Sequence, residues 1–366
     1  MLEATFREAN ELYVFFSLLA KGQVDLGDAN GESAGVAPIM AVVRHEHDGM
    51  RQYGIESDDV RVEIGGTVQF FPREDFAAAA ELILQVMKQT PKSENGAKTV
   101  LDLTDIEPFL DALQIFDLEA QTEDRTNMHL LLWHHDAPLT GVRIQSNLCG
   151  FQPLLAGGRT SNIKFEQTGV RFSSPAVHKI NWTDQPENIA EVGRRILYIQ
   201  SLGGQLKYSD VADKIFKSNL LMVDTNLPRI LASMLMTLFI DGTARIDELT
   251  ALMEEKNPLK VKDELVRKHG FYAHKMRQLL LAVVWGMRPT KQYQGRPSAI
   301  SGYLMVDKQG VIRLYSRADE QTFADYLFHH TRLEKGLPDE DKYGYLEREN
   351  GAYYLKLNLK IGLIKR

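Results

Sequence analysis

Polar and apolar residues alternate along residues 141–146, which read Gly-Val-Arg-Ile-Gln-Ser. Residues separated by one position lie on the same face of a strand, so Arg143 and Gln145 share a face. In metal-dependent phosphodiester hydrolysis, carboxylates hold Mg²⁺ against the phosphate, and a lysine two residues along a strand orients or activates the water. The strand has the spacing for this chemistry but carries other residue types. The alternative is a strand face that is simply solvated.

Carboxylates that could serve such a site lie in two other places. Glu8 and Glu11 lie on an amphipathic helix predicted over residues 3–20, and Glu123 and Asp124 form an acidic loop before a strand. The histidine pairs lack the spacing of a structural zinc site, so we interpret them as surface or hydrogen-bonded residues. The sequence also contains no phosphate-binding glycine loop and no nucleophile elbow. The carboxylates therefore remain the candidate metal ligands.

The chemistry-bearing strand needs partners, and the pattern predicts them. Residues 128–135 read as a strand that forms an antiparallel hairpin with 141–146. Thr104 followed by Glu107 predicts a capping box for a helix. The expected helices are residues 3–20, 75–88, 104–113, 186–202, 226–255, 261–286 and 322–328. The other expected strands are 37–44, 60–70 with a turn at 65–66, 300–306, 311–315 and 353–364. The order indicates a mixed α and β fold, helical in its middle third.

Composition narrows the class of protein. The 366 residues are 44% hydrophobic and 25% charged, which is typical of a globular protein with one large domain or two modest ones. A single cysteine, Cys149, excludes an internal disulfide framework, and neither a signal-peptide pattern nor a membrane-length apolar run is present. We therefore expect a cytoplasmic protein. The net charge of −6 argues against a protein that coats nucleic acid, but it does not exclude a specific DNA reader.

Several blocks occur in a recognisable order along the chain. They are ELYVFFSLLAKG, PLTGVRIQSNLCG, LLAGGRTSNIKFE, SGYLMVDKQGVIRLYS, FADYLFHHTR and KYGYLERENGAYYLKLNLKI. In this order they resemble the HpaII-type Type II restriction endonucleases of the PD-(D/E)xK nuclease superfamily. The resemblance runs nearly end to end, and the closing blocks are the most specific.

The resemblance implies a fold, a cofactor and partners. The fold is a PD-(D/E)xK-like mixed sheet flanked by helices, with residues 1–185 as nuclease-like core, 186–290 as helical segment and 291–366 as β-rich part, packed as one large domain. The implied cofactor is Mg²⁺, and the substrate is double-stranded DNA with a short palindrome such as CCGG. A palindrome suits a homodimer. A cognate DNA methyltransferase would complete a cytoplasmic restriction-modification system.

The site that the resemblance implies departs from the family pattern. Glu11 and Glu8 match acidic helix positions that look like metal ligands, but Asn127 stands where a metal-binding aspartate is expected. The family's Ser-x-Lys strand corresponds to Arg143-Ile144-Gln145. Asparagine brings no charge to offset a dication, and glutamine is not a cationic donor. Arg143 puts a positive charge where a metal would sit, although it could bind the scissile phosphate itself.

Several functional hypotheses stay open. The chain could be an active endonuclease with carboxylates drawn from Glu11, Asp124, Asp136 or Glu166. It could be a degenerate relative, or an inactivated form, that binds DNA without cutting it. It could also be a protein-interaction module on a nuclease fold. Cleavage in Mg²⁺ and binding to a CCGG duplex distinguish these hypotheses.

Donor-rich segments outside the strand are candidates for DNA contacts. Arginine reads guanine through two hydrogen bonds, which suits a G·C-rich site. The alternative is that these residues contact phosphates or are ordinary surface charges. The candidates are Arg159, Thr160, Ser161, Asn162 and Lys164, then Arg288, Lys291 and Arg296, and finally Arg332.

Overall fold

The predicted hairpin is present in the computed structural model of the chain. Strand β8 (Met128–Leu132) pairs antiparallel with β9 (Thr140–Ser146), and Met128 lies opposite Val142. The structure describes residues 2–91, 99–120, 122, 124–133, 139–182, 190–296 and 298–365. The expected strand end and turn at residues 134–138, with Asp136, lie outside these ranges, as does Glu123. The hairpin prediction is confirmed for the described residues.

The hairpin lies in the middle of a mixed sheet. Within the described residues this sheet has nine strands in the order β2-β13-β12-β9-β8-β3-β4-β5-β6. Strands β12 and β9 are parallel, as are β13 and β2, whereas the other paired neighbours are antiparallel. The remaining strands of this sheet are β2 Gln23–Gly27, β3 Ser33–Glu46, β4 Gly49–Ile55, β5 Asp59–Ile64, β6 Thr67–Pro72, β12 Ile300–Val306 and β13 Ile312–Ser316.

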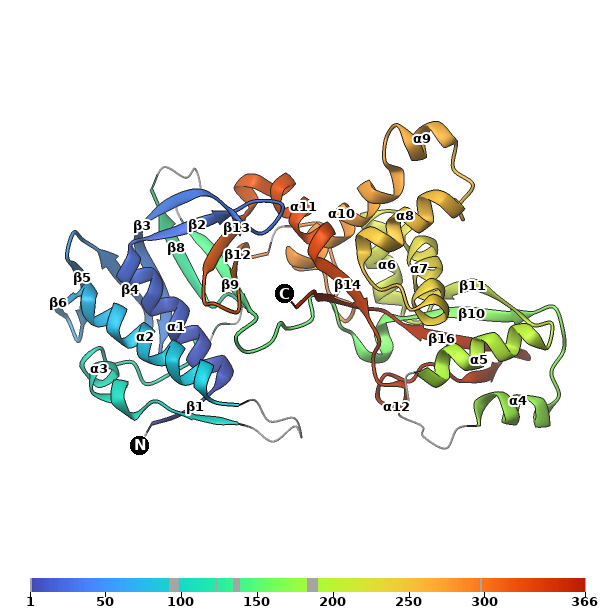
Figure 1. The fold of residues 1–366 in the computed structure, drawn as a ribbon, viewed down its shortest axis with the longest axis horizontal. Coiled ribbons are helices and arrows are strands. Elements are labelled where there is room, and N and C mark those ends of the chain that lie inside the picture. The colour runs from blue at the N-terminus through green and yellow to red at the C-terminus, as the bar shows by residue number, and fades with distance from the viewer. Residues whose placement is uncertain are drawn as a thin grey trace. The chain divides into compact units, whose positions relative to one another are not determined.

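Helices cover both faces of this sheet. Helices α1 (Phe6–Lys21) and α2 (Arg73–Gln89) pack side by side (Figure 1) and share one apolar core with Val142 and Leu304. Tyr303 alternates with Leu304, so it faces the other side, where it packs on Phe323 of α11 (Glu320–His330). The predicted mixed α and β fold, with a mixed sheet flanked by helices, is confirmed.

Helix α1 begins with a capping box, a motif that the sequence pattern predicts at Thr104 instead. The Thr5 hydroxyl accepts a hydrogen bond from the Glu8 backbone N–H, and the Glu8 carboxylate accepts one from the Thr5 backbone N–H. Thr104 instead accepts a hydrogen bond from the Leu2 backbone N–H and donates its hydroxyl to Asp102, so the expected capping box at Thr104 is wrong. Capping fixes the start of α1, and therefore the face on which later residues of the helix lie.

Short elements complete this part of the chain. Most of them lie within residues 3–112, and one follows β13. They are β1 Glu3–Thr5 with its antiparallel partner β7 Val100–Asp102, the 3-10 helices η1 Thr104–Ile106 and η3 Arg317–Asp319, and α3 Glu107–Ala112.

The chain divides into two units, and each is described by itself. Unit 1 comprises residues 1–152, 297–323 and 365–366 and holds the mixed sheet. Unit 2 comprises residues 153–296 and 324–364. The expected core over residues 1–185, helical segment over 186–290 and β-rich part over 291–366 stay a prediction. Strands β12 and β13 return to the sheet of unit 1, whereas the last strands of the chain join unit 2.

Unit 2 combines a helical cluster with an antiparallel sheet in the order β11-β10-β16-β15. Glycines with left-handed φ angles, Gly242 (81°) and Gly270 (57°), break two helices that the sequence pattern made continuous. Its helices are α4 Ser174–Asn181, α5 Ala190–Ser201, α6 Lys214–Val223, α7 Leu227–Asp241, α8 Ile246–Lys256, α9 Asp263–Arg267, α10 Phe271–Val284, α12 Pro338–Asp341 and the 3-10 helix η2 Gly158–Ser161. Its strands are β10 Asn162–Thr168, β11 Gln205–Val211, β15 Leu346–Glu349, β16 Ala352–Asn358 and the pair β14 Thr331–Glu334 with β17 Lys360–Leu363.

The helices of the structure are short or polar compared with a membrane span. Among the residues that the structure describes, none of the helices is both long enough and apolar enough to cross a bilayer.

Candidate functional site

Asn127 lies where strands β8 and β9 meet. Its backbone N–H donates to the carbonyl of Val142 at 2.8 Å, which continues the hairpin ladder by one residue. Its side-chain oxygen accepts a hydrogen bond from the Ile144 backbone N–H at 2.9 Å. Two bonds to the same strand leave the Asn127 amide little freedom. Its amino group therefore points in a fixed direction, away from β9.

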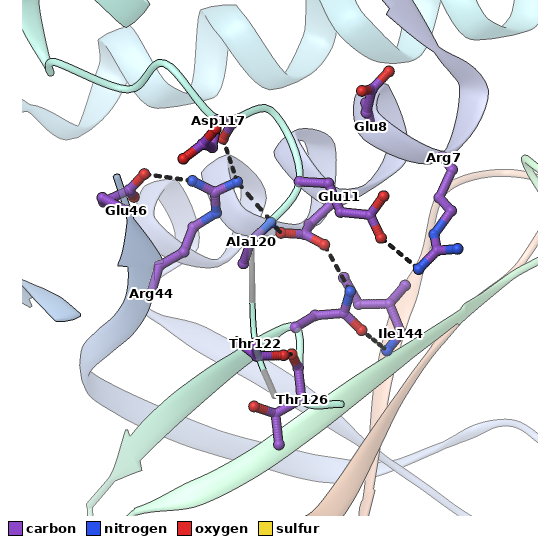
Figure 2. A network of polar contacts seen from close by, with 12 residues as sticks. Arg7, Glu8, Glu11, Arg44, Glu46, Asp117, Ala120, Thr122, Thr126 and Ile144 are labelled. Carbon is purple, nitrogen blue, oxygen red and sulfur yellow. Dashed lines mark hydrogen bonds and ion pairs between the residues drawn. The ribbon is translucent and has the colours of Figure 1, made fainter. Parts of the chain in front are cut away.

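Glu11 of α1 receives that amino group. The Asn127 Nδ2 donates to Glu11 Oε2 at 2.6 Å, and the Ala120 backbone N–H donates to Oε1 at 2.7 Å (Figure 2). The Glu11 side chain is 2% exposed, because α1 packs this face against the sheet. Burial raises the pKa of the Glu11 carboxyl, and the Arg44 guanidinium works in the opposite direction. Both carboxylate oxygens are thus occupied by donors from the chain itself.

A buried guanidinium supplies the positive charge behind Glu11. Arg44 of β3 is fully buried; its Nη2 lies 3.4 Å from Glu11 Oε1, and its Nη1 donates to Glu46 at 2.7 Å. The same guanidinium donates to the Asp117 carbonyl, and the Tyr53 hydroxyl donates to the second oxygen of Glu46 at 2.7 Å. Burial raises the pKa of the Tyr53 hydroxyl, so this group stays a donor. The interior of unit 1 therefore holds two carboxylates with one counter-charge.

Arg143 lines a pocket in front of Asn127. The pocket has a volume of about 300 Å³, and its walls are polar. The side chain of Arg7 at its wall is 65% exposed and forms an ion pair with Glu119. Three guanidinium groups and one carboxylate give the lining a formal charge of plus two. The lining residues are Arg7, Glu119, Ala120, Thr122, Arg125, Thr126, Asn127 and Arg143.

The loop that forms the pocket wall is held by its own hydrogen bonds. The Thr122 hydroxyl donates to the Thr126 carbonyl at 2.5 Å, and the Thr126 hydroxyl donates to Asp124 Oδ1 at 2.7 Å. Burial works to raise the pKa of the Asp124 carboxyl, but the bonds from Thr126 outweigh it and the pKa is lowered. Arg125, between them, has a left-handed φ of 70°. Asp124 is therefore an ionised residue that shapes the loop.

These residues do not fit a divalent cation. Mg²⁺ needs several oxygen ligands, of which carboxylates carry the compensating charge. Glu11 already binds Ala120, Asn127 and Arg44, and the Asn127 oxygen accepts the Ile144 N–H. Across the described ranges, no group of three or more histidine, cysteine, aspartate or glutamate side chains could hold a metal.

The other residues expected at the catalytic centre have structural contacts. Gln145 is buried, and its side-chain oxygen accepts a hydrogen bond from the Gln152 backbone N–H at 3.1 Å, so it holds the loop after β9. Gln145 is not among the residues that line the pocket. Glu8 completes the capping box that Thr5 begins, and it lies apart from the Glu11 network (Figure 2). The structure thus brings together Glu11, Asn127 and Arg143, but not Gln145 or Glu8.

The first group of expected DNA contacts lies at the start of β10 in unit 2. Ser161 and Asn162 are buried: the Ser161 hydroxyl donates to the Gly158 carbonyl, and the Asn162 amino group donates to the last carbonyl of α12 and to the one that follows it. Lys164 forms an ion pair with Glu349, and its Nζ lies 4.0 Å from the Tyr354 ring centre. Thr160 donates its hydroxyl to the Gly157 carbonyl at 2.6 Å. Arg159 is exposed, so it alone of the five presents an uncovered charge.

The second group lies beside the first. Lys291 and Arg296 are exposed, and the Asn219 amide binds the carbonyls of Arg288 and Lys291 at 2.7 Å each, which fixes the turn between them. A methyl group added at Gly157 would meet Pro289 of this turn at 2.6 Å, so the turns that carry Arg159 and Lys291 touch.

Arg332, the last expected DNA contact, forms an ion pair within the chain. Arg332 of β14 is half-buried, and its Nη2 lies 3.2 Å from Glu334 Oε1.

Sequence reasoning missed the residues that give the site its charge. Arg7 and Arg125 were not candidates, because an exposed helix arginine and a loop arginine carry no distinctive pattern. Arg44 and Glu46 lie at the end of an apolar strand. Charged residues at alternate positions of a buried strand were the signal that could have identified this ion pair. Glu166, weighed as an alternative carboxylate, lies on β10 in unit 2.

The fold and the paired strands define a nuclease-like mixed α and β protein. The chain belongs to the HpaII restriction endonuclease family, whose model matches residues 5–363. It is 28% identical over 362 residues to a protein of Haemophilus parainfluenzae, the Type II restriction enzyme HpaII, covering 97% of this chain and 96% of that relative. No solved structure is significantly similar to the chain. Membership of this family gives the protein a Type II restriction-endonuclease-like class of function.

Proposed function

We propose that this protein binds double-stranded DNA at a short palindromic site, CCGG-like, and does not hydrolyse it through Mg²⁺ at the Glu11 and Asn127 site. The observation that carries the proposal is the closed carboxylate of Glu11, which accepts hydrogen bonds from Ala120 and Asn127 and pairs with Arg44. A metal would have to displace these partners and the positive charge of Arg143 nearby. Membership of a DNA-cutting family supports DNA as the ligand.

The recognition surface in this proposal is the joined pair of turns in unit 2. Arg159 and Lys291 are exposed there, on turns that touch through Gly157 and Pro289. Exposed arginine and lysine side chains on short fixed turns can reach base edges or phosphates. Recognition of a palindrome is best served by a homodimer, and the system would include a cognate DNA methyltransferase in the cytoplasm.

A second candidate function is Mg²⁺-dependent cleavage of the same DNA. It is favoured by the similarity to a Type II restriction enzyme over 97% of this chain. It requires carboxylates other than Glu11, or a rearrangement that frees Glu11 from Asn127 and Arg44.

The test compares binding with cleavage. We expect the native protein to shift a CCGG duplex more strongly than a scrambled duplex in EDTA and in Ca²⁺, and to leave a plasmid with CCGG sites intact in Mg²⁺ or Mn²⁺. Cutting of the plasmid supports the second candidate and refutes the first. If neither duplex binds at low salt, the DNA-binding proposal is lost and a protein-interaction role gains support.

The turns of unit 2 give a separate prediction. Replacing Arg159 or Lys291 by alanine is expected to weaken binding to the CCGG duplex, by roughly 1–3 kcal/mol where the side chain reads a base. A phosphate contact would instead weaken binding to both duplexes about equally. Arg267→Ala is the matched control, because Arg267 is exposed in the same unit on α9. Equal affinities for all three variants and the native chain would refute this surface.

A further inference from the structure

We propose that the pocket lined by Arg7, Arg125 and Arg143 binds a phosphodiester group of the DNA backbone directly, with guanidinium charge taking the place of a metal ion. This inference rests on the proposed DNA binding and assigns a ligand to one site. The lining carries a formal charge of plus two, equal to the charge of the cation that the family pattern implies. A phosphodiester carries one negative charge, so it complements the pocket.

Arg143 is the residue best placed to hold the phosphate. It projects from the middle of β9, where pairing with β8 and β12 on either side fixes the backbone. Its side chain is half-buried, and no described residue forms a hydrogen bond or ion pair with its guanidinium. A partly desolvated guanidinium has five donors to satisfy, and its planar fork matches two oxygens of a phosphate.

The carboxylates near the pocket have partners within the chain, and Asp124 of the same loop accepts its hydrogen bonds from Thr126. Glu119 is paired with Arg7, and Glu11 lies behind Asn127 with Arg44 as counter-charge. The Asn127 side chain is the layer between them: its amino group faces Glu11 and its carbonyl faces β9. Asparagine thus brings no negative charge to the pocket wall, where an aspartate would repel a phosphate.

The threonines of the lining shape the pocket and do not compete for its ligand. The hydroxyls of Thr122 and Thr126 both donate within the loop, to the Thr126 carbonyl and to Asp124. Recognition is therefore mainly electrostatic and indifferent to base sequence, as expected for a backbone contact. Such a contact would fix the register of DNA while other residues read the bases.

The consequence is DNA binding that needs no divalent metal. In a metal-dependent site, EDTA removes the charge that holds the phosphate, but here the charge is covalently part of the chain. Binding should therefore persist in EDTA, and Mg²⁺ should not strengthen it, because Mg²⁺ acts here only as a competing counterion of the DNA. The contribution of Arg143 should appear in the salt dependence, since each neutralised phosphate changes the slope of log K against log salt by about 0.9.

The experiment measures duplex binding by fluorescence anisotropy between 50 and 300 mM NaCl, at concentrations chosen to span roughly the range in which counterion release dominates. Arg143→Gln is expected to lower affinity about 10-fold or more and to reduce the salt slope by about one. Arg143→Lys keeps the charge and should keep the slope, with a smaller loss of affinity. Arg61→Gln, an exposed arginine on β5 of the same unit, is the matched control and should change little.

The outcomes separate this inference from the proposed function. Native binding with an unchanged slope in Arg143→Gln overturns the phosphate assignment and leaves DNA binding intact. Absence of native binding at low salt overturns both. A third outcome concerns free phosphate. Inorganic phosphate could raise the melting temperature of the native protein, compared with NaCl at equal ionic strength, and fail to raise that of Arg143→Gln. If the two proteins then bound the duplex with equal affinity, the pocket would be a free-phosphate site and the assignment would be overturned. Retention of the slope in Arg143→Lys excludes misfolding as the cause of the loss.

Discussion

Replacing Arg44 by methionine is expected to lower the free energy of unfolding by about 3–5 kcal/mol, the cost of leaving buried charge without its partner. Arg44 is the buried counter-charge of both Glu11 and Glu46, and all three side chains are almost completely buried. Methionine fills a similar volume but donates no hydrogen bond. Two carboxylates would then lie in the interior with no cation. Urea-induced unfolding at pH 7 measures the loss.

The pH dependence of this loss has a definite sign. Burial already raises the pKa of Glu11 above its ordinary value, and Arg44 opposes that rise. Without Arg44 the folded-state pKa rises further, so the folded variant binds a proton more tightly than its unfolded chain does. The contribution of such a group to the free energy of unfolding increases as the pH falls from its folded-state pKa toward its unfolded-state pKa. The difference between native and variant proteins should therefore shrink between pH 7 and about pH 5.

Two controls isolate the buried charge. Arg61→Met removes an exposed arginine of β5 and should change stability by less than about 0.5 kcal/mol. Adding Glu11→Gln and Glu46→Gln to Arg44→Met removes the unpaired charges and should recover part of the loss. A variant Arg44→Met that is as stable as Arg61→Met would mean that the carboxylates are not held as a charged cluster.

The elements around the site could be predicted because their signals are local. Helix α1 and the β8–β9 hairpin follow from apolar spacing and from turn residues within a few positions. The pairing of strands that are distant in the sequence could not be predicted in this way. Asn162 of β10 bonds to Asn358 of β16, 196 residues away, and neither strand shows in its own pattern which strand it will pair with.

The candidate site shows the same limit. The resemblance to known nucleases pointed to Asn127 and Arg143 together, because these positions follow from the order of the strands. It also pointed to Gln145 as a catalytic residue, yet its oxygen holds the Gln152 backbone N–H. A strand pattern gives the face on which a residue lies, but it does not say whether the side chain forms a hydrogen bond with a neighbouring loop. The charge of the pocket also depends on Arg125 of the loop before β8 and on Arg7, which the packing of α1 brings to the site.

Replacing Asn127 by aspartate is expected to make stability depend on a divalent metal. The new carboxylate oxygen would stand where Nδ2 now lies, 2.6 Å from Glu11 Oε2, and two carboxylates this close do not both ionise without a cation between them. In EDTA we expect a loss of about 1–3 kcal/mol. Ca²⁺ or Mg²⁺ at about 100 times its dissociation constant should return about 2.7 kcal/mol. Thermal unfolding with and without metal measures both effects.

A matched asparagine tests whether metal rescue belongs to this site. Asn181 also accepts a hydrogen bond from a backbone N–H, that of Leu346 at 2.8 Å. Its amino group donates to the Leu346 carbonyl, whereas that of Asn127 donates to a carboxylate. Asn181→Asp should therefore lose stability in EDTA without recovering it in Ca²⁺ or Mg²⁺. Equal metal responses from the two variants would refute a site built on Glu11.

Adding Gln145→Lys and Arg143→Ser to Asn127→Asp should then restore cleavage. The triple variant adds a second carboxylate and removes the guanidinium that would repel a metal. The lysine can act at the site only if it leaves the buried contact that Gln145 now makes with the Gln152 backbone N–H. We expect plasmid nicking in Mn²⁺ or Mg²⁺ at least about 100-fold faster than by the native chain, the usual scale of a positioned catalytic group. A triple variant that folds and binds Mn²⁺ but still does not cut would mean that the departures at these three positions do not account for the absence of cleavage that we propose for the native chain. Cleavage by Asn127→Asp alone would instead identify the missing carboxylate as the dominant loss, because Gln145 and Arg143 would then be compatible with a loaded site.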